Sequence, residues 1–242
     1  MKRHSIHIGI DRYEDDAIQN LPFCNADARL LASFFQDVAE YESVTVLSDP
    51  TRNSILDAVS DEADRLNPGD MLVLSYSGHG FQSRDQHFIG AADSRMLFIR
   101  EGVDGVPLAV LKRVIDKAGC DCAFFIDACP DVGMGTRDIK VSNPSDEKSG
   151  RDLDFYSSDA FKGTSFTIMA PEMSIESTSL GHGIFTAALD RALREAHAAG
   201  KPAMDSAFYE LVNKHAKAIC QESGLQNPFI WVQSCGHTAN LW

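Results

Sequence analysis

Two short, almost uninterrupted apolar runs constrain the fold of this chain more than any other feature of its sequence. Met71–Tyr76 reads MLVLSY, and Cys122–Ile126 reads CAFFI. Runs of this kind are typical of strands that are buried on both faces, as in parallel sheets covered by helices. The sequence therefore predicts an α/β fold with a parallel sheet.

Strand and helix patterns alternate along the rest of the chain in the way that such a fold requires. Further strands are predicted at Ser5–Ile10, Ser43–Leu47, Gln86–Ala92 and Ser165–Ala170, with Gln86–Ala92 beside Met71–Tyr76. Helices are predicted after an Asn25 cap, after a Thr51 cap, between Pro107 and Gly119, and over Gly183–Ala199 and Met204–Glu222.

Composition narrows the class of protein. The 242 residues suit a single domain over 1–242, and the net charge of −13 disfavours a nucleic-acid partner, whose phosphates bind basic surfaces. The apolar stretch near the N-terminus is too short for a signal sequence, and no run is long enough to cross a membrane. We expect a cytoplasmic protein that has neither a nucleic-acid nor a membrane partner.

One long segment, residues 130–163, interrupts the alternation. It is polar and has no apolar periodicity. A stretch of this length without secondary structure is usually functional or disordered. We predict a mobile linker that is open to proteolysis.

Reactive side chains follow both central runs. His79 lies within Ser-Gly-His-Gly after the first run, and Cys129 follows Asp127-Ala128 after the second. Because the carboxyl ends of parallel strands meet at one edge of a sheet, a thiol and an imidazole can pair there. The backbone N–H groups of Gly80 and Cys129 would then form an oxyanion hole.

Each of these residues also has a structural interpretation, as a turn histidine and as a small buried thiol. A second Gly-His-Gly string contains His182, but it precedes a predicted helix instead of following a buried strand. We therefore interpret His182 as structural.

A set of motifs occurs in order along nearly the whole chain. They are HIGIDRY, LPFCNADARLLASFF, LSYSGHG, FFIDAC, SIESTSLGHGIFTAAL and QNPFIW. In this set the chain resembles the caspase-like cysteine peptidases, in their metacaspase and bacterial branch. The resemblance implies a three-layer sandwich with a mostly parallel six-stranded sheet between helices. It also implies His79 as general base and acid, Cys129 as nucleophile, and Gly80 with Cys129 as oxyanion donors.

The resemblance further implies where the substrate side chain binds. The family pattern places the residues of the S1 pocket on the first helix, two residues before the Cys, and after a later strand. Those positions correspond here to Asp27, Asp127 and Glu176, and Ser174 is assigned to the same substrate-binding set. Three acidic residues would select a peptide with Arg or Lys at P1.

Other interpretations of these acids stay open. Asp27 could favour the N-terminal end of its helix dipole, Asp127 could cap a turn, and Glu176 could be a solvated loop charge. The enzyme could also prefer a non-basic P1 residue, or the fold could serve as a catalytically silent adaptor.

Control of the activity is the last expectation. The chemistry needs no cofactor, but Ca²⁺ is a candidate activator, with acidic pairs at Asp15-Asp16 and at Asp152 with Asp154. An activating protein partner is an alternative. The predicted linker carries basic residues that suit the proposed pocket, so we expect autoprocessing after one of Arg137, Lys140, Lys148 and Arg151.

Overall fold

The computed structural model describes residues 1–83, 86–100, 103–128, 166–171, 175–224, 230–235 and 241–242. Residues 130–163, predicted to be a linker, lie outside this part of the chain, as do Cys129 and Ser174.

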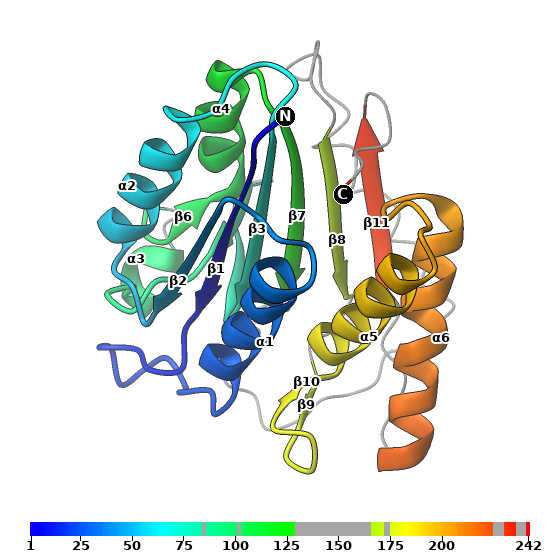
Figure 1. The fold of residues 1–242 in the computed structure, drawn as a ribbon. Coiled ribbons are helices and arrows are strands. Elements are labelled where there is room, and N and C mark those ends of the chain that lie inside the picture. Colours follow the sequence, from blue (N-terminus) through cyan, green and yellow to red (C-terminus); the bar gives the residue numbers. More distant parts are fainter. Residues whose placement is uncertain (84–85, 101–102, 129–165, 172–174, 225–229, 236–240) are drawn as a thin grey trace.

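A six-stranded sheet forms the centre of the molecule (Figure 1). Its strands are β1 (Arg3–Gly9), β2 (Ser43–Ser48), β3 (Met71–Ser77), β7 (Asp121–Asp127), β8 (Phe166–Pro171) and β11 (Ile230–Cys235). The order is β11-β8-β7-β3-β1-β2, with five parallel strands and β11 antiparallel to β8. The predicted mostly parallel six-stranded sheet is confirmed.

Helices cover both faces of the sheet and make a three-layer sandwich (Figure 1). One layer contains α1 (Cys24–Asp37), α5 (Ile184–Ala198) and α6 (Ser206–Ser223), and the other contains α2 (Arg52–Ala63) and α4 (Leu108–Ala118). Neighbouring residues of β7 pack on opposite faces of the sheet. Phe124 lies in the core beneath α2 and α4, and Phe125 lies in the core beneath α1 and α5. This explains why the strand sequences lack polar alternation.

Two of the predicted helix ends are observed in the structure, and a third is not. Thr51 caps α2 by accepting a hydrogen bond from the Ser54 backbone N–H (3.2 Å), and Gly119 ends α4 with a φ of 70°. Asn25 is not the cap of α1, so that prediction was wrong: the cap position is Phe23, whose side chain makes no capping bond. The Asn25 backbone N–H instead donates to Asp11 Oδ1 (2.9 Å), so a distant carboxylate replaces the local cap.

A strand does form within Gln86–Ala92, but the prediction that it lies beside Met71–Tyr76 was wrong. The strand is β5 (Gln86–Ile89), and it pairs antiparallel with β4 (Gly80–Ser83) and β6 (Val106–Pro107) in a separate three-stranded sheet. In the central sheet β3 already has β1 and β7 as neighbours. No position beside β3 was left for another strand.

Three short elements complete the described structure. They are α3 (Met96–Arg100) and the strands β9 (Glu176–Ser177) and β10 (His182–Gly183), which pair antiparallel with each other. Within the described residues, no helix has the length and apolar character needed to span a bilayer.

Candidate active site

The backbone of His79 is held at the carboxyl edge of the sheet by two tyrosine hydroxyls. The His79 N–H donates to the Tyr13 hydroxyl (2.9 Å), and the Tyr76 hydroxyl donates to the His79 carbonyl (2.8 Å). Gly78 lies against both rings, since a Cβ there would come within 2.4 Å of the Tyr76 hydroxyl oxygen. The glycine before His79 is therefore required by close packing.

The His79 ring has one nitrogen engaged. Its Nε2 lies 2.8 Å from the Gln19 carbonyl oxygen, and its ring centroid lies 5.1 Å from that of Tyr13. A carbonyl only accepts, so Nε2 carries the proton and Nδ1 of the neutral ring is left as an acceptor. Burial lowers the pKa of His79, and the Gln19 carbonyl opposes that shift. The neutral, proton-accepting form is therefore favoured near pH 7.

The other residues predicted for the chemistry are described only in part. Gly80 is buried at the start of β4, opposite Ile89. Cys129 lies outside the described residues, but it directly follows Ala128, the residue after the end of β7. Register pairs Ser77 with Asp127, so His79 and Cys129 each come two residues after a matched pair on adjacent strands.

Asp27 is the centre of a buried hydrogen-bond cluster. Its side chain is 2% exposed. Its Oδ2 accepts from the Ser77 hydroxyl (2.8 Å), its Oδ1 lies 3.0 Å from His182 Nδ1, and the Gly183 N–H donates to both oxygens at 3.1 and 3.3 Å. One carboxylate therefore joins α1 to the end of β3 and to β10.

Asp127 lies in the same cluster. Its Oδ2 accepts from the Thr186 hydroxyl (2.7 Å) and backbone N–H (3.2 Å), which places a carboxylate at the N-terminus of α5. A Cβ on Gly183 would lie 2.4 Å from Asp127 Oδ2 and 3.1 Å from Asp27 Oδ2. The carboxylates of Asp27 and Asp127 therefore both lie against Gly183, where a side chain would clash.

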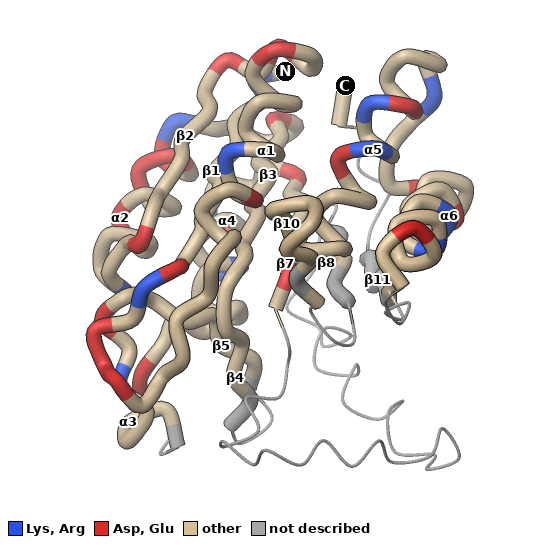
Figure 2. The backbone as a smooth tube through the Cα atoms, turned by 90° about the horizontal axis from the view of Figure 1, so that it is seen from below, with Lys and Arg blue, Asp and Glu red and all other residues tan. Residues whose placement is uncertain are grey.

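Figure 2 views the molecule from the carboxyl ends of the parallel strands, where β10 lies between α1 and β7. The structure thus brings together Asp27 and Asp127, two of the four predicted substrate-binding residues. Glu176 lies in β9 opposite Gly183, and its side chain is outside the described set, as is all of Ser174.

Sequence reasoning missed four members of the cluster. They are Ser77, His182, Gly183 and Thr186. His182 was interpreted as structural, and the structure puts its ring on a predicted pocket residue 155 positions away. The repeated Gly-His-Gly string was the one available signal, and it carried no information about that contact.

Asp15, one of the residues considered for Ca²⁺, accepts hydrogen bonds within the fold. Asp15 Oδ1 accepts from the Ala17 N–H (2.9 Å) and Oδ2 from the Met96 N–H (2.8 Å), and these bonds lower its pKa. No group of three or more metal-ligating side chains occurs within the described residues. Asp152 and Asp154 lie outside them.

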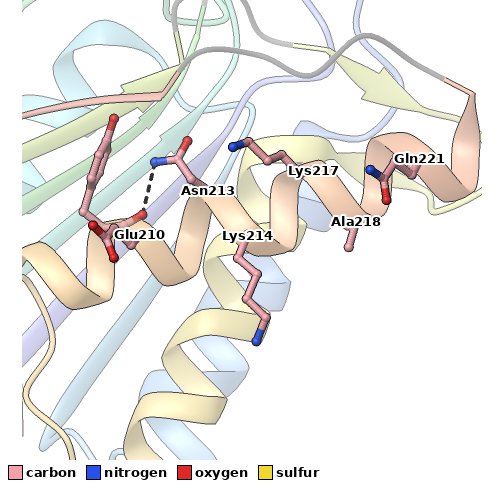
Figure 3. A pocket seen from close by; sticks show the side chains of 7 residues that line it. Glu210, Asn213, Lys214, Lys217, Ala218 and Gln221 are labelled. Carbon is pink, nitrogen blue, oxygen red and sulfur yellow. Dashed lines mark hydrogen bonds between the residues drawn. The ribbon is translucent and has the colours of Figure 1, made fainter.

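A hollow elsewhere on the molecule is lined by one face of α6 (Figure 3). Its side chains include Glu210, Asn213, Lys214 and Lys217, and Asn213 donates to the Tyr209 carbonyl (3.1 Å). It contains neither His79 nor the aspartates. The candidate site is therefore defined by the strand ends and not by this hollow.

The fold places the chain among three-layer α/β proteins whose polar side chains gather at the carboxyl edge of a sheet. A family model described as the caspase domain matches residues 2–239. The chain therefore belongs to the caspase-domain family of cysteine peptidases.

Two individual proteins illustrate the similarity. Metacaspase-1 of Pyricularia oryzae is 32% identical over 94 residues, which are 35% of this chain and 23% of that protein. The crystal structure of protein GSU0716 from Geobacter sulfurreducens matches with a TM-score of 0.64 at 18% identity, over 98% of this chain and 94% of that one. The second similarity concerns the fold alone.

Proposed function

We propose that this protein is an endopeptidase that cleaves after Arg or Lys, using Cys129 and His79. The observation that carries the P1 preference is the meeting of Asp27 and Asp127 at Gly183, on the sheet edge that also bears His79. The caspase-domain family match supports the reaction class.

In the proposed reaction His79 Nδ1 takes the Cys129 thiol proton, and the thiolate attacks the scissile carbonyl carbon. The oxyanion is stabilised by the N–H groups of Gly80 and Cys129. His79 then gives the proton to the leaving amine, and an acyl-enzyme remains. His79 then takes a proton from water, which attacks the acyl carbon; the carboxylic acid product leaves, and His79 returns the proton to the Cys129 thiolate.

The basic P1 preference follows from the cost of burying acids together. Asp27 and Asp127 have exposed fractions of 2% and 1%. The donors to Asp27 are the Ser77 hydroxyl, the His182 ring and the Gly183 N–H, and among the described residues no Lys or Arg side chain forms an ion pair with Asp27. A substrate guanidinium or ammonium would place a positive charge beside this buried carboxylate.

The proposal is tested with fluorogenic peptides that vary only at P1, with and without Ca²⁺. We expect cleavage of Arg and Lys peptides by the wild type, and none by Cys129→Ala. Asp127→Ala should lose most of kcat/KM toward Arg. Asp190→Asn is the matched control, because Asp190 lies on α5 paired with Arg194 at 3.0 Å and should not alter the preference.

Three outcomes separate the alternatives. Efficient cleavage after Asp or Leu would overturn the basic pocket. Equal activity in the wild type and in Cys129→Ala would overturn the nucleophile. Partner binding by a protein that cleaves no peptide would favour a silent adaptor.

Activation is part of the same proposal. Ca²⁺ or a protein partner is the proposed trigger, and peptides or proteins with a basic residue at P1 are the proposed substrates. The chemistry itself would use the Cys, the His and backbone donors alone, and the proposed location is the cytoplasm.

A further inference from the structure

His182 is the part of the Asp27 cluster that reaches solvent. Its side chain is 26% exposed, whereas that of Asp27 is 2% exposed. Its Nδ1 lies 3.0 Å from Asp27 Oδ1, and its Nε2 has no hydrogen-bond partner within the described residues. The imidazole is therefore bound on one side to a buried acid and open on the other.

Asp27 has two other donors, from Ser77 and from Gly183. Ser77 ends the buried strand β3, and the Gly183 donor is a backbone N–H. His182 is the one donor to Asp27 in the described structure that belongs to a side chain on the short β9–β10 pair. Oδ1 is therefore held by this imidazole together with the Gly183 N–H.

We infer that His182 is a positioning residue for P1 specificity: its Nδ1–H fixes the Asp27 carboxylate in the orientation that receives the P1 cation. This inference rests on the proposed basic pocket. It assigns a specificity role to a residue that the sequence predicts to be only structural.

The hydrogen bonds to Asp27 indicate what the His182 Nδ1–H contributes. Asp27 Oδ1 is shared by His182 and the Gly183 N–H, and Oδ2 is shared by Ser77 and the same N–H. Without the imidazole, Oδ1 would keep only the longer, shared bond at 3.1 Å. The carboxylate could then rotate toward Ser77, away from a P1 side chain.

Two substitutions distinguish a donor from a space-filling ring. His182→Asn places an amide N–H near the position of Nδ1, whereas His182→Gln places it one bond further out, near the position of Nε2. His182→Ala removes both. His215→Ala is the matched control, because His215 Nε2 pairs with Glu195 Oε2 at 2.9 Å between α6 and α5.

KM and kcat are measured for each variant on two peptides that differ only in Arg or norleucine at P1. His182→Ala and His182→Gln should raise KM for the Arg peptide roughly tenfold, the effect of losing one hydrogen bond to a charged group. Their kcat and their norleucine kinetics should stay near wild type. His182→Asn should recover most of the Arg affinity, and His215→Ala should change neither peptide.

Iodoacetamide labelling of Cys129 and thermal unfolding show whether each variant is folded. If His182→Ala does not fold, the Asn and Gln variants decide. If turnover is too slow to measure, the labelling rates of Cys129 by Arg and norleucine chloromethyl ketones give the same comparison.

Three results are decisive. An unchanged Arg KM in His182→Ala, equal losses in the Asn and Gln variants, or parallel losses on both peptides would each overturn the role of His182 while the basic pocket stands. A wild type without preference for Arg over norleucine would instead overturn the proposed pocket itself.

Discussion

The two tyrosines around His79 give the most local test of the site. In Tyr13→Phe the part-buried His79 N–H loses its acceptor, which costs about 1 kcal/mol or more. We expect kcat/KM to fall roughly tenfold or more, because the imidazole is no longer held in register with the thiol.

Tyr41→Phe is the control for that variant. Its hydroxyl is also buried, and it donates to the Leu241 carbonyl (2.8 Å), away from His79. It should lower the unfolding temperature without changing kcat/KM. Equal kinetic effects in the two variants would contradict the positioning role of Tyr13.

The state of His79 predicts a pH profile. Since burial lowers its pKa, the neutral base should persist below the ordinary histidine value of 6.5. As the pH falls, kcat/KM should therefore decline with an apparent pKa below 6.5. A decline centred above 6.5 would show that burial does not control this group.

His7 makes stability, and not activity, depend on pH. It is fully buried, bonded through Nδ1 to the Ser75 hydroxyl (2.7 Å), and burial lowers its pKa to about 3. The unfolded chain takes up a proton below pH 6.5 and the folded chain does not, so stability is lost as the pH falls from 6.5 toward 3.

Urea unfolding measures this effect. Between pH 7.5 and 5.5 the His7 contribution should fall by about 1.4 kcal/mol. His7→Gln removes the titrating group and should lose correspondingly less stability over the same interval. Identical pH dependence in both proteins would refute the assignment.

The junction between β10 and α5 depends on Gly183. In Gly183→Ala the new Cβ would approach Asp127 Oδ2 to 2.4 Å, so one of the acids must move. We expect a stability loss of about 1–3 kcal/mol and the loss of selectivity for Arg over norleucine.

Gly200→Ala separates the clash from the backbone effect. Gly200 has a φ of 61°, and a Cβ there would meet nothing within 4 Å. It should lower stability through strain alone and leave selectivity intact. If both variants kept selectivity, the two acids would not form the P1 pocket.

Five strands of the central sheet, β1, β2, β3, β7 and β8, were predicted from local pattern, whereas no strand was predicted at β11. The apolar runs of β3 and β7 and the signals at Thr51 and Gly119 reflect burial or turn geometry within a few residues. The start of α1 could not be predicted in this way, because the Asn25 N–H donates to the side chain of Asp11, which is 14 residues away. The sheet to which β5 belongs likewise depends on which positions the other strands occupy.

The motifs single out His79, Asp27 and Asp127 as candidates but do not predict their arrangement. The contacts of Asp27 with Ser77 and His182 span 50 and 155 residues. No local pattern encodes such pairs. They depend on the packing of α1 and β10 at the end of β3, which brings together parts of the chain that are far apart in sequence.

For the molecule as a whole, we predict slow self-cleavage within residues 130–163. The expected sites are Arg137, Lys140, Lys148 and Arg151, with the two arginines favoured because a guanidinium pairs bidentately with a carboxylate. Intact mass should show fragments in the wild type and not in Cys129→Ala. Equal fragments in both would indicate a contaminating protease, and an active but uncut wild type would show that activity needs no processing.

The most direct test of the central claim is the selectivity of iodoacetamide at neutral pH. Burial raises the pKa of Cys120 to about 12 and also raises the pKa values of Cys122 and Cys220, while Cys24 is 2% exposed, so these thiols should react slowly. The account predicts that Cys129 is labelled far ahead of the other five cysteines, and that His79→Ala abolishes its advantage. Equal labelling of all six, or an advantage that survives in His79→Ala, would contradict the Cys129–His79 pair.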